Sequence, residues 1–179
     1  GFALPRGISA VPITSVPKEE DVLLKAIHTC PIVEKRTAEL PKTARWQKLN
    51  SDNQDFIREI AKITGFNMTD IDGFHAAYDH LNCMKCHNLL KLQPVLDQWV
   101  KLETLAWDIQ YLRHNREVQG NLAGGLLVDA IFNSMSAFIA GKQQPKYVHY
   151  SAHDTTILSL FAALDLADDF PQLQENINY

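Results

Sequence analysis

The sequence predicts an α/β fold in which a helical subdomain interrupts an α/β core. Three observations lead to this prediction: helical periodicity dominates residues 18–119, helical and strand-like patterns alternate in residues 120–179, and a short β-type run occupies residues 11–16. Helix, strand and helix in close succession are typical of an α/β layer with a parallel strand. We therefore expect a strand segment of the core at residues 1–17, a helical subdomain at residues 18–119 and a second core segment at residues 120–179.

Composition favours one folded domain that binds no nucleic acid and contains no membrane segment. The chain has 179 residues, of which 46% are hydrophobic, enough for a real core. Its formal net charge of -4 gives no basic surface for nucleic acid, and we expect no membrane segment because no apolar run approaches ~20 residues. The start, "GFALPRGISAVPITSV", has neither an initiator Met nor a signal-like segment. We therefore expect the sequence to come from the middle of a longer chain.

Proline, glycine and apolar spacing define the elements of the first two parts. Pro12 and Pro17 would limit the run at 11–16 to a short or edge strand. In the helical subdomain we expect helices at residues 19–27, 52–63, 71–81 and 95–113. Gly65 is well placed to end the second helix and Pro94 to precede the fourth. Apolar residues three and four apart give the fourth helix one stripe, formed by Leu96, Trp99, Val100, Leu102, Leu105, Ile109 and Leu112.

The last part combines two helical patterns with one strand-like pattern. Residues 122–140 form an apolar helix, and Gly141 follows its end. The aromatic and β-branched residues at 147–150 indicate a short strand. Residues 155–164 again have a helical pattern. The residues between the expected strand and this last helix are therefore the first place to look for a site.

His153 and Asp154 lie on that connection. In open α/β sheets ligands gather at the carboxyl ends of the strands, and a helix N-terminus offers free N–H groups to an anion. Asp154 could equally be a helix cap or first-turn acid, worth ~1 kcal/mol of stability. Position alone leaves both interpretations open.

Several stretches resemble one known family. "YSAHDTTILSLFAAL" resembles the second signature of the histidine acid phosphatases, the prostatic and lysosomal type within the histidine phosphatase superfamily. Earlier stretches resemble the family in the same order, namely "VPITSVPKEEDVLL", "HTCP", "AAYDHLNCMKCHN" and "QGNLAGGLLVDAIFNSM". The resemblance spans nearly the whole chain. It implies a phosphoglycerate-mutase-like α/β core, partial here, with an inserted helical subdomain.

The resemblance also implies hydrolysis of small phosphomonoesters without metal or cofactor. In the family a histidine attacks phosphorus, arginines hold the phosphate oxygens and a carboxylic acid protonates the departing alcohol. Asp154 matches the proton donor, and His153 matches the histidine that contacts the phosphate. Phe74 falls where the family often has an aromatic residue in the substrate pocket, although core packing explains it equally well. A protonated carboxyl beside a cationic histidine suits work below neutral pH.

The family's first signature, Arg-His-Gly-x-Arg-x-Pro, holds the nucleophile and is absent from this sequence. The nearest string, Arg-His-Asn-Arg at residues 113–116, lacks the glycine and the proline and resembles a polar helix end. We therefore expect an internal fragment of the enzyme, inactive by itself, with the nucleophile and the phosphate-binding arginines outside it. A catalytically silent relative that binds phosphate-bearing ligands is the alternative.

The cysteines and one sequon bear on cofactor and location. Cys30 and Cys83 match family cysteines whose disulfide partners lie beyond this sequence, whereas Cys86 has no counterpart. "CMKCH" matches a c-type haem attachment pattern, so a haem-binding helical protein is a further alternative, whereas the nearby histidines and cysteines fit no usual zinc spacing. Asn67 begins an Asn-Met-Thr glycosylation sequon. With the resemblance, these features favour a secreted or lysosomal protein, and we expect a homodimer at full length.

Overall fold

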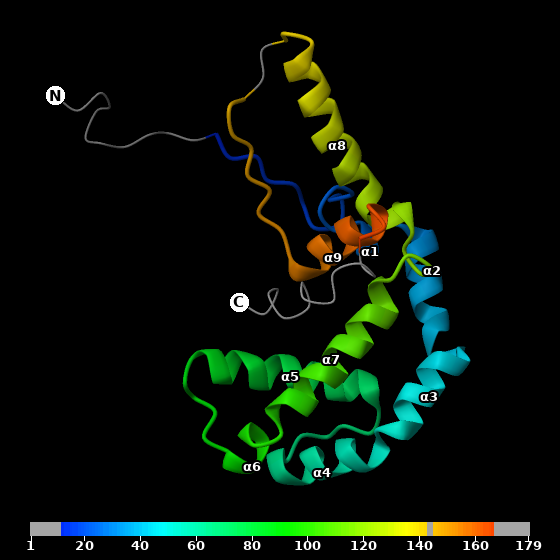
Figure 1. The fold of residues 1–179 in the computed structure, drawn as a ribbon, viewed down its shortest axis with the longest axis vertical. Coiled ribbons are helices and arrows are strands. Elements are labelled where there is room, and N and C mark those ends of the chain that lie inside the picture. Colours follow the sequence, from blue (N-terminus) through cyan, green and yellow to red (C-terminus); the bar gives the residue numbers. More distant parts are fainter. Residues whose placement is uncertain (1–11, 143–144, 167–179) are drawn as a thin grey trace, which may run out of the picture.

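The computed structural model describes residues 12–142 and 145–166, and every regular element within these ranges is a helix (Figure 1). The expected α/β fold is therefore wrong for the described residues. The segment at 147–150 has no regular secondary structure, and Tyr147 is 76% exposed. Residues 12–16 also form no strand, and the start of the expected strand segment 1–17 lies outside the described residues. A strand depends on hydrogen bonds to a neighbouring strand, and the composition of one segment cannot supply them.

The larger core is built from α3 (Ala44–Asp52), α4 (Gln54–Thr64), α5 (Ile71–Cys86), α6 (Gln93–Leu96) and α7 (Trp99–His114). Leu102 and Ile109 of α7 are fully buried, together with Ile57 of α4 and Leu81 of α5. The helix expected at 95–113 is divided by a turn at residues 97–98, so that Leu96 belongs to α6. Most of the predicted apolar stripe lies on the buried face of α7, but Val100 is 77% exposed. The stripe therefore positions α7 against α4 and α5.

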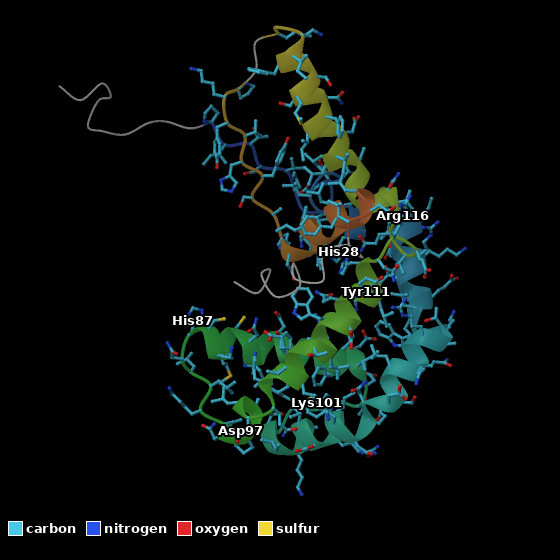
Figure 2. All side chains as sticks on the ribbon, in the orientation of Figure 1. His28, His87, Asp97, Lys101, Tyr111 and Arg116 are labelled. Atoms are coloured by element: carbon cyan, nitrogen blue, oxygen red, sulfur yellow. The ribbon has the colours of Figure 1, made fainter. Side chains whose placement is uncertain are left out.

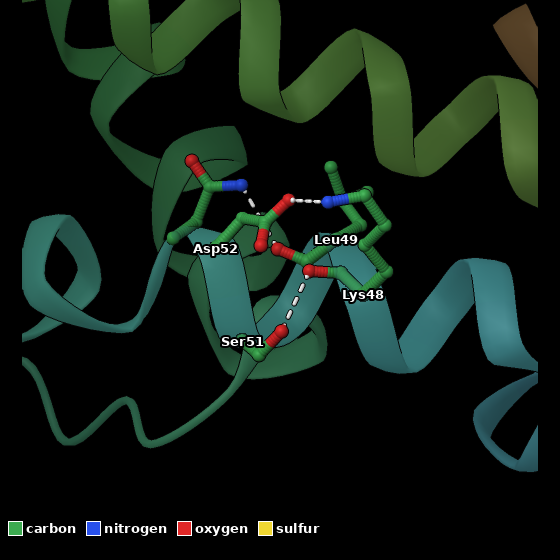
Figure 3. Close-up of polar contacts among 5 residues, drawn as sticks. Lys48, Leu49, Ser51 and Asp52 are labelled. Carbon is green, nitrogen blue, oxygen red and sulfur yellow. Dashed lines mark hydrogen bonds and ion pairs between the residues drawn. The ribbon is translucent and has the colours of Figure 1, made fainter.

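Local polar contacts stabilise the end of α3, just before α4 begins (Figure 3). Near the end of α3, Lys48 Nζ forms an ion pair with Asp52 at 2.7 Å, and Ser51 Oγ donates to the carbonyl of Lys48 at 3.0 Å. Asn53 follows α3 and precedes α4, and its Nδ2 donates to the carbonyl of Leu49 at 2.9 Å. Since the last carbonyls of a helix lack partners within the helix, this side-chain bond stabilises the end of α3.

A second group of helices lies above this core in Figure 1. It contains α1 (Ala26–Thr29), α2 (Pro31–Glu39), η2 (Leu40–Lys42), α8 (Asn121–Ile139) and α9 (Asp154–Ala163). The prediction of a helix at 19–27 is wrong for most of that range, because the residues before Ala26 form turns and α1 begins only at Ala26. The α8 and α9 helices cross closely, and α8 then extends beyond α9.

Buried polar side chains connect the two groups of helices. Ser159 Oγ of α9 lies 2.7 Å from Gln119 Oε1, and Gln119 Nε2 contacts Nδ1 of His114 at the end of α7. All three residues are at most 7% exposed. Arg36 Nη1 adds a bond to the carbonyl of Val118 at 3.2 Å. The contacts through Gln119 fix α9 relative to the end of α7.

The outer part of α8 carries exposed apolar side chains, including Phe132, Phe138 and Ile139. By length and hydropathy alone α8 could cross a membrane, and it is the only helix in the described residues that meets this test. Core helices of soluble proteins meet the same test, so the result does not by itself indicate a membrane protein.

Candidate active site

The α9 helix begins at the His-Asp pair. His153 is the N-cap residue, with an extended backbone (φ -119°, ψ 165°), and Asp154 is the first helical residue. The His153 N–H donates to Thr156 Oγ1 at 3.3 Å, and Thr156 Oγ1 donates to the carbonyl of Leu24 at 2.7 Å. Asp154 Oδ1 accepts the Thr155 N–H at 2.7 Å. Asp154 is thus a first-turn acid rather than the N-cap, and it remains exposed.

Asp154 lines a cavity of about 330 Å³ together with residues of α5 and α7. The α5 helix supplies His75, Tyr78, Asp79, Asn82, Cys83 and Cys86, with His87 just past its end, and α7 supplies Ala106, Trp107 and Gln110. The spacing of the α5 residues follows from helix geometry, because positions three and four apart share one face. Asp154 was predicted as a site residue from the sequence. The structure places it beside one face of α5, about 70 residues earlier in the chain, and this face forms a wall of the cavity.

Burial makes the histidine beside this wall a weak base. Burial, assisted by the positive charge of Arg113, lowers the pKa of His75 to about 4, although Asp79 and Asp154 act in the opposite direction. His75 is therefore neutral at pH 5. Burial also raises the pKa of Tyr78, so that its hydroxyl stays protonated and can donate a hydrogen bond. Asp79 and Asp154 are the two carboxyl groups of the lining.

No lysine or arginine is among the described residues that line the cavity, and one further basic residue, His28, lies near His153. His153 is exposed and does not line the cavity. The pKa of His28 is lowered, first by burial and then by the charges of Lys25 and Lys18. His153 lies close enough to His28 to contribute to the same shift. Figure 2 shows His28 beside α9. The start of α9 thus has His28 near His153, whereas Asp154 lines a cavity that also contains Asp79, His75 and His87.

The remaining sequence-predicted residues lie apart from this arrangement. Phe74 is 1% exposed and packs against Phe56, with ring centroids 5.9 Å apart, so it belongs to the core and does not line the cavity. Its neighbour His75 does. Asn67 is exposed on the connection between α4 and α5.

The three cysteines are free thiols in the structure. Cys30 is half-buried, and Cys83 and Cys86 are exposed. Among the described residues no group of three or more His, Cys, Asp or Glu side chains is placed to hold a metal ion. Cys83, Cys86 and His87 of the haem-like string lie at the end of α5, where all three line the cavity.

Sequence reasoning missed the residues that surround the His-Asp pair. His75 and Asp79 lie four apart on α5, a spacing that was visible, but Trp107, Gln110 and His28 could be assigned only from tertiary packing. A charged or aromatic side chain on a helix is ordinarily a surface or core residue, so its type alone gives no signal.

The site therefore combines a His-Asp pair at the start of α9 with a cavity between α9, α5 and α7. The family model of the histidine phosphatase superfamily (branch 2) matches residues 18–178, and the chain belongs to this family. The resemblance stated from the sequence is thereby confirmed.

Curated relatives agree with this assignment. The chain is 32% identical to lysosomal acid phosphatase of Xenopus laevis over 162 residues, which cover 87% of this chain and 38% of the relative. It is 32% identical to prostatic acid phosphatase of Homo sapiens over 163 residues, covering 87% and 42% respectively. With lysosomal acid phosphatase of Rattus norvegicus the identity is 30% over 161 residues, covering 87% and 38%. The chain thus spans about two-fifths of the length of these relatives.

Proposed function

We propose that this chain supplies the proton donor and one wall of the substrate site of an acid phosphatase that hydrolyses phosphomonoesters. The observation that carries the proposal is the placement of Asp154 at the first residue of α9, facing a cavity, directly after His153, which lies near His28. A carboxyl at this junction can reach the oxygen that joins a phosphate on one side to an alcohol on the other. Relatives named lysosomal and prostatic acid phosphatase support this reading.

The proposed reaction has two steps through a phosphohistidine. A nucleophilic histidine outside this sequence attacks phosphorus, the P–O bond to the alcohol breaks, and Asp154 gives its proton to the leaving oxygen. The Asp154 carboxylate then takes a proton from water as the water oxygen attacks phosphorus and the P–N bond breaks. His153 donates a hydrogen bond to a phosphate oxygen, and the N-terminus of α9 adds a favourable dipole for the anion.

Further expectations for the full-length protein rest on the same family assignment. Cys30 and Cys83 would each form a disulfide with a cysteine outside this sequence, and Asn67 would carry a glycan in a secreted or lysosomal protein. The exposure of Cys83 and Asn67 is compatible with both modifications. We also expect the full-length protein to form a homodimer.

A catalytically silent, phosphate-binding relative is the second candidate. The signature Arg-His-Gly-x-Arg-x-Pro, which would distinguish the two candidates, is not in this sequence, which spans about two-fifths of its relatives' length. The two candidates make the same use of His153 but differ at Asp154, because binding requires no proton donor.

The test is Asp154→Asn in a protein that contains this chain together with the first signature. The fold and phosphate binding should persist, because the amide is nearly isosteric. The kcat/KM for an alkyl phosphate should fall by ~10²–10⁴-fold, the usual range for loss of a positioned proton donor. The loss should be smaller for p-nitrophenyl phosphate, whose phenolate leaves without much help.

Asp129→Asn, at an exposed carboxylate of α8 whose partner is Asn133, is the matched control and should leave both rates unchanged. Equal, near-unity effects of Asp154→Asn on both substrates would remove Asp154 from the mechanism. Phosphate binding without turnover by the wild-type protein would establish the silent relative.

A further inference from the structure

The cavity beside Asp154 is poorly suited to phosphate itself. No Lys or Arg is among the described residues that line it, and its lining includes Asp79 and Asp154. Asp154 must carry a proton before it acts as the acid, so Asp79 is the lasting negative charge. His87 is eight residues further along the chain, roughly 12 Å from Asp79 in helix rise, so it is too distant to pair with Asp79. His28 lies near His153, which does not line the cavity.

Two polar groups of the cavity lack partners among the described residues. Tyr78 lines the cavity and is 7% exposed, yet its buried hydroxyl has no hydrogen-bond partner there. The Asp79 carboxylate has no hydrogen-bond or ion-pair partner among the side chains of the described residues. Arg113 of α7, whose charge acts on His75 in the cavity wall, is paired with Asp72 and does not line the cavity. Buried polar groups are ordinarily paired, so the unpaired Tyr78 hydroxyl can bond a ligand group or a water molecule in the cavity.

The rest of the lining suits a compact, partly apolar body. Trp107 and Ala106 of α7 provide aromatic and apolar surface opposite the polar face of α5. A volume of about 330 Å³ is at the lower end of the ~300–1,000 Å³ range of small-molecule sites. An ammonium group near Asp79 would be attracted by the carboxylate and by the face of the indole ring.

From this geometry we propose that the cavity binds the leaving alcohol and selects phosphomonoesters whose alcohol carries a protonated amine, with Asp79 as the counter-ion. The inference rests on the proposed function, because Asp154 marks the position of the leaving oxygen at one edge of the cavity. Asp79 is then a specificity residue that contacts the substrate. The phosphate remains on the His153 side, and Trp107 packs against the hydrocarbon part of the alcohol.

The first experiment measures binding of the alcohol part alone to the 179-residue chain. Tyramine and 4-ethylphenol share the phenol ring and differ in the ammonium group, so their affinities at pH 6 isolate the effect of charge. We expect tyramine to bind about tenfold more tightly than 4-ethylphenol. The preference is no larger because Asp79 is exposed, so that solvent and salt screen its attraction for the ammonium group. Asp79→Asn should abolish the preference, and Asp79→Lys should reverse it.

Asp97→Asn is the control. Asp97 is the residue after α6, where its carboxylate accepts from Gln93 at 2.7 Å away from the cavity lining (Figure 2), so the tyramine preference should persist. Equal affinities for the two phenols, or a tyramine preference that survives Asp79→Asn, would overturn the inference. Far-ultraviolet circular dichroism of each variant checks that the helices are retained.

The second experiment separates this inference from the proposed phosphatase activity. In the protein that also contains the first signature, the phosphate esters of tyramine and 4-ethylphenol have similar leaving groups, so kcat should be similar and KM about tenfold lower for the amine ester. Asp79→Asn should equalise the KM values. If both esters react with equal KM in the wild type, the inference fails and the phosphatase stands. If neither reacts but tyramine still binds selectively, the phosphatase fails and the amine selectivity of the cavity stands.

Discussion

The α-carbon of Gly124 in α8 lies directly against the backbone carbonyl of Ser159 in α9. A Cβ built on Gly124 would lie 2.1 Å from the Ser159 oxygen and 2.6 Å from its carbonyl carbon. Backbone atoms cannot move aside as a flexible side chain can, so only glycine permits this crossing.

We therefore predict that Gly124→Ala destabilises the chain although alanine is the better helix former. Overpacking costs typically ~1–3 kcal/mol, and here backbone must shift. Gly125→Ala is the matched control, since the nearest atom to its added Cβ is Cβ of Asn121 at 3.5 Å, an ordinary contact. That variant should be neutral or up to ~1 kcal/mol more stable through helix propensity. Urea denaturation of both variants decides the matter, and equal stabilities would refute the close crossing.

Ser159→Ala should cost about 1–3 kcal/mol for a different reason. The Ser159 hydroxyl is 2.7 Å from both Gln119 Oε1 and the Thr155 carbonyl, and it donates its single hydrogen to one of them at a time. Alanine would leave the buried Gln119 oxygen without this donor. Ser136→Ala at an exposed position of α8 should change the free energy of unfolding by less than ~0.5 kcal/mol. A Ser159 variant as stable as the Ser136 variant would contradict this prediction.

Stability should fall as the pH drops from about 6.5 to about 4. Burial lowers the pKa of His114 to about 4 in the folded chain, with Arg113 acting in the same direction, from an unfolded value of 6.5. Between these two pKa values the unfolded chain binds more protons than the folded chain. The loss of unfolding free energy is therefore absent above the pKa of the unfolded chain and complete below the pKa of the folded chain. For His114 the loss is roughly 3 kcal/mol, and His75 changes stability in the same direction. His114→Gln should flatten the curve of unfolding free energy against pH, and a curve as steep as that of the wild type would exclude His114 as the cause.

The 179-residue chain by itself should show no phosphatase turnover. Its sequence has no Arg-His-Gly-x-Arg-x-Pro, and a proton donor without a nucleophile cannot complete a covalent two-step route. The measurement is hydrolysis of p-nitrophenyl phosphate in metal-free buffer after repeated purification. Activity that co-purifies with the chain at constant specific rate would show this prediction to be wrong.

Helices were predictable here because their signal is local. The expected helix at 71–81 corresponds to Ile71–Cys86, and the one at 122–140 to Asn121–Ile139. Both have apolar residues repeating three and four apart, which one segment shows without reference to another. The α2 and α3 helices were missed although Pro31 at the first position of α2 and the N-cap Thr43 of α3 are recognisable start signals. Their exposed, polar faces lack a clear stripe.

Strands and the cavity depend on distant parts of the chain. The residues at 147–150 have strand composition, but pairing requires a second segment that composition does not identify. Likewise, Asp154 was singled out from its neighbours in sequence, whereas its neighbours in space, such as Trp107, became known only once α7 was placed.

The hydrogen bond from Thr156 to the Leu24 carbonyl joins residues 132 apart in the chain. Contacts of such large sequence separation require closure of a long loop, which is entropically unfavourable until the intervening helices are formed. The start of α9 is therefore expected to become ordered late during folding, after α3 to α7 have packed. A chain arrested before that step would already be largely helical while Asp154 still lacked a fixed position, so circular dichroism would recover sooner than any property that depends on the His-Asp pair.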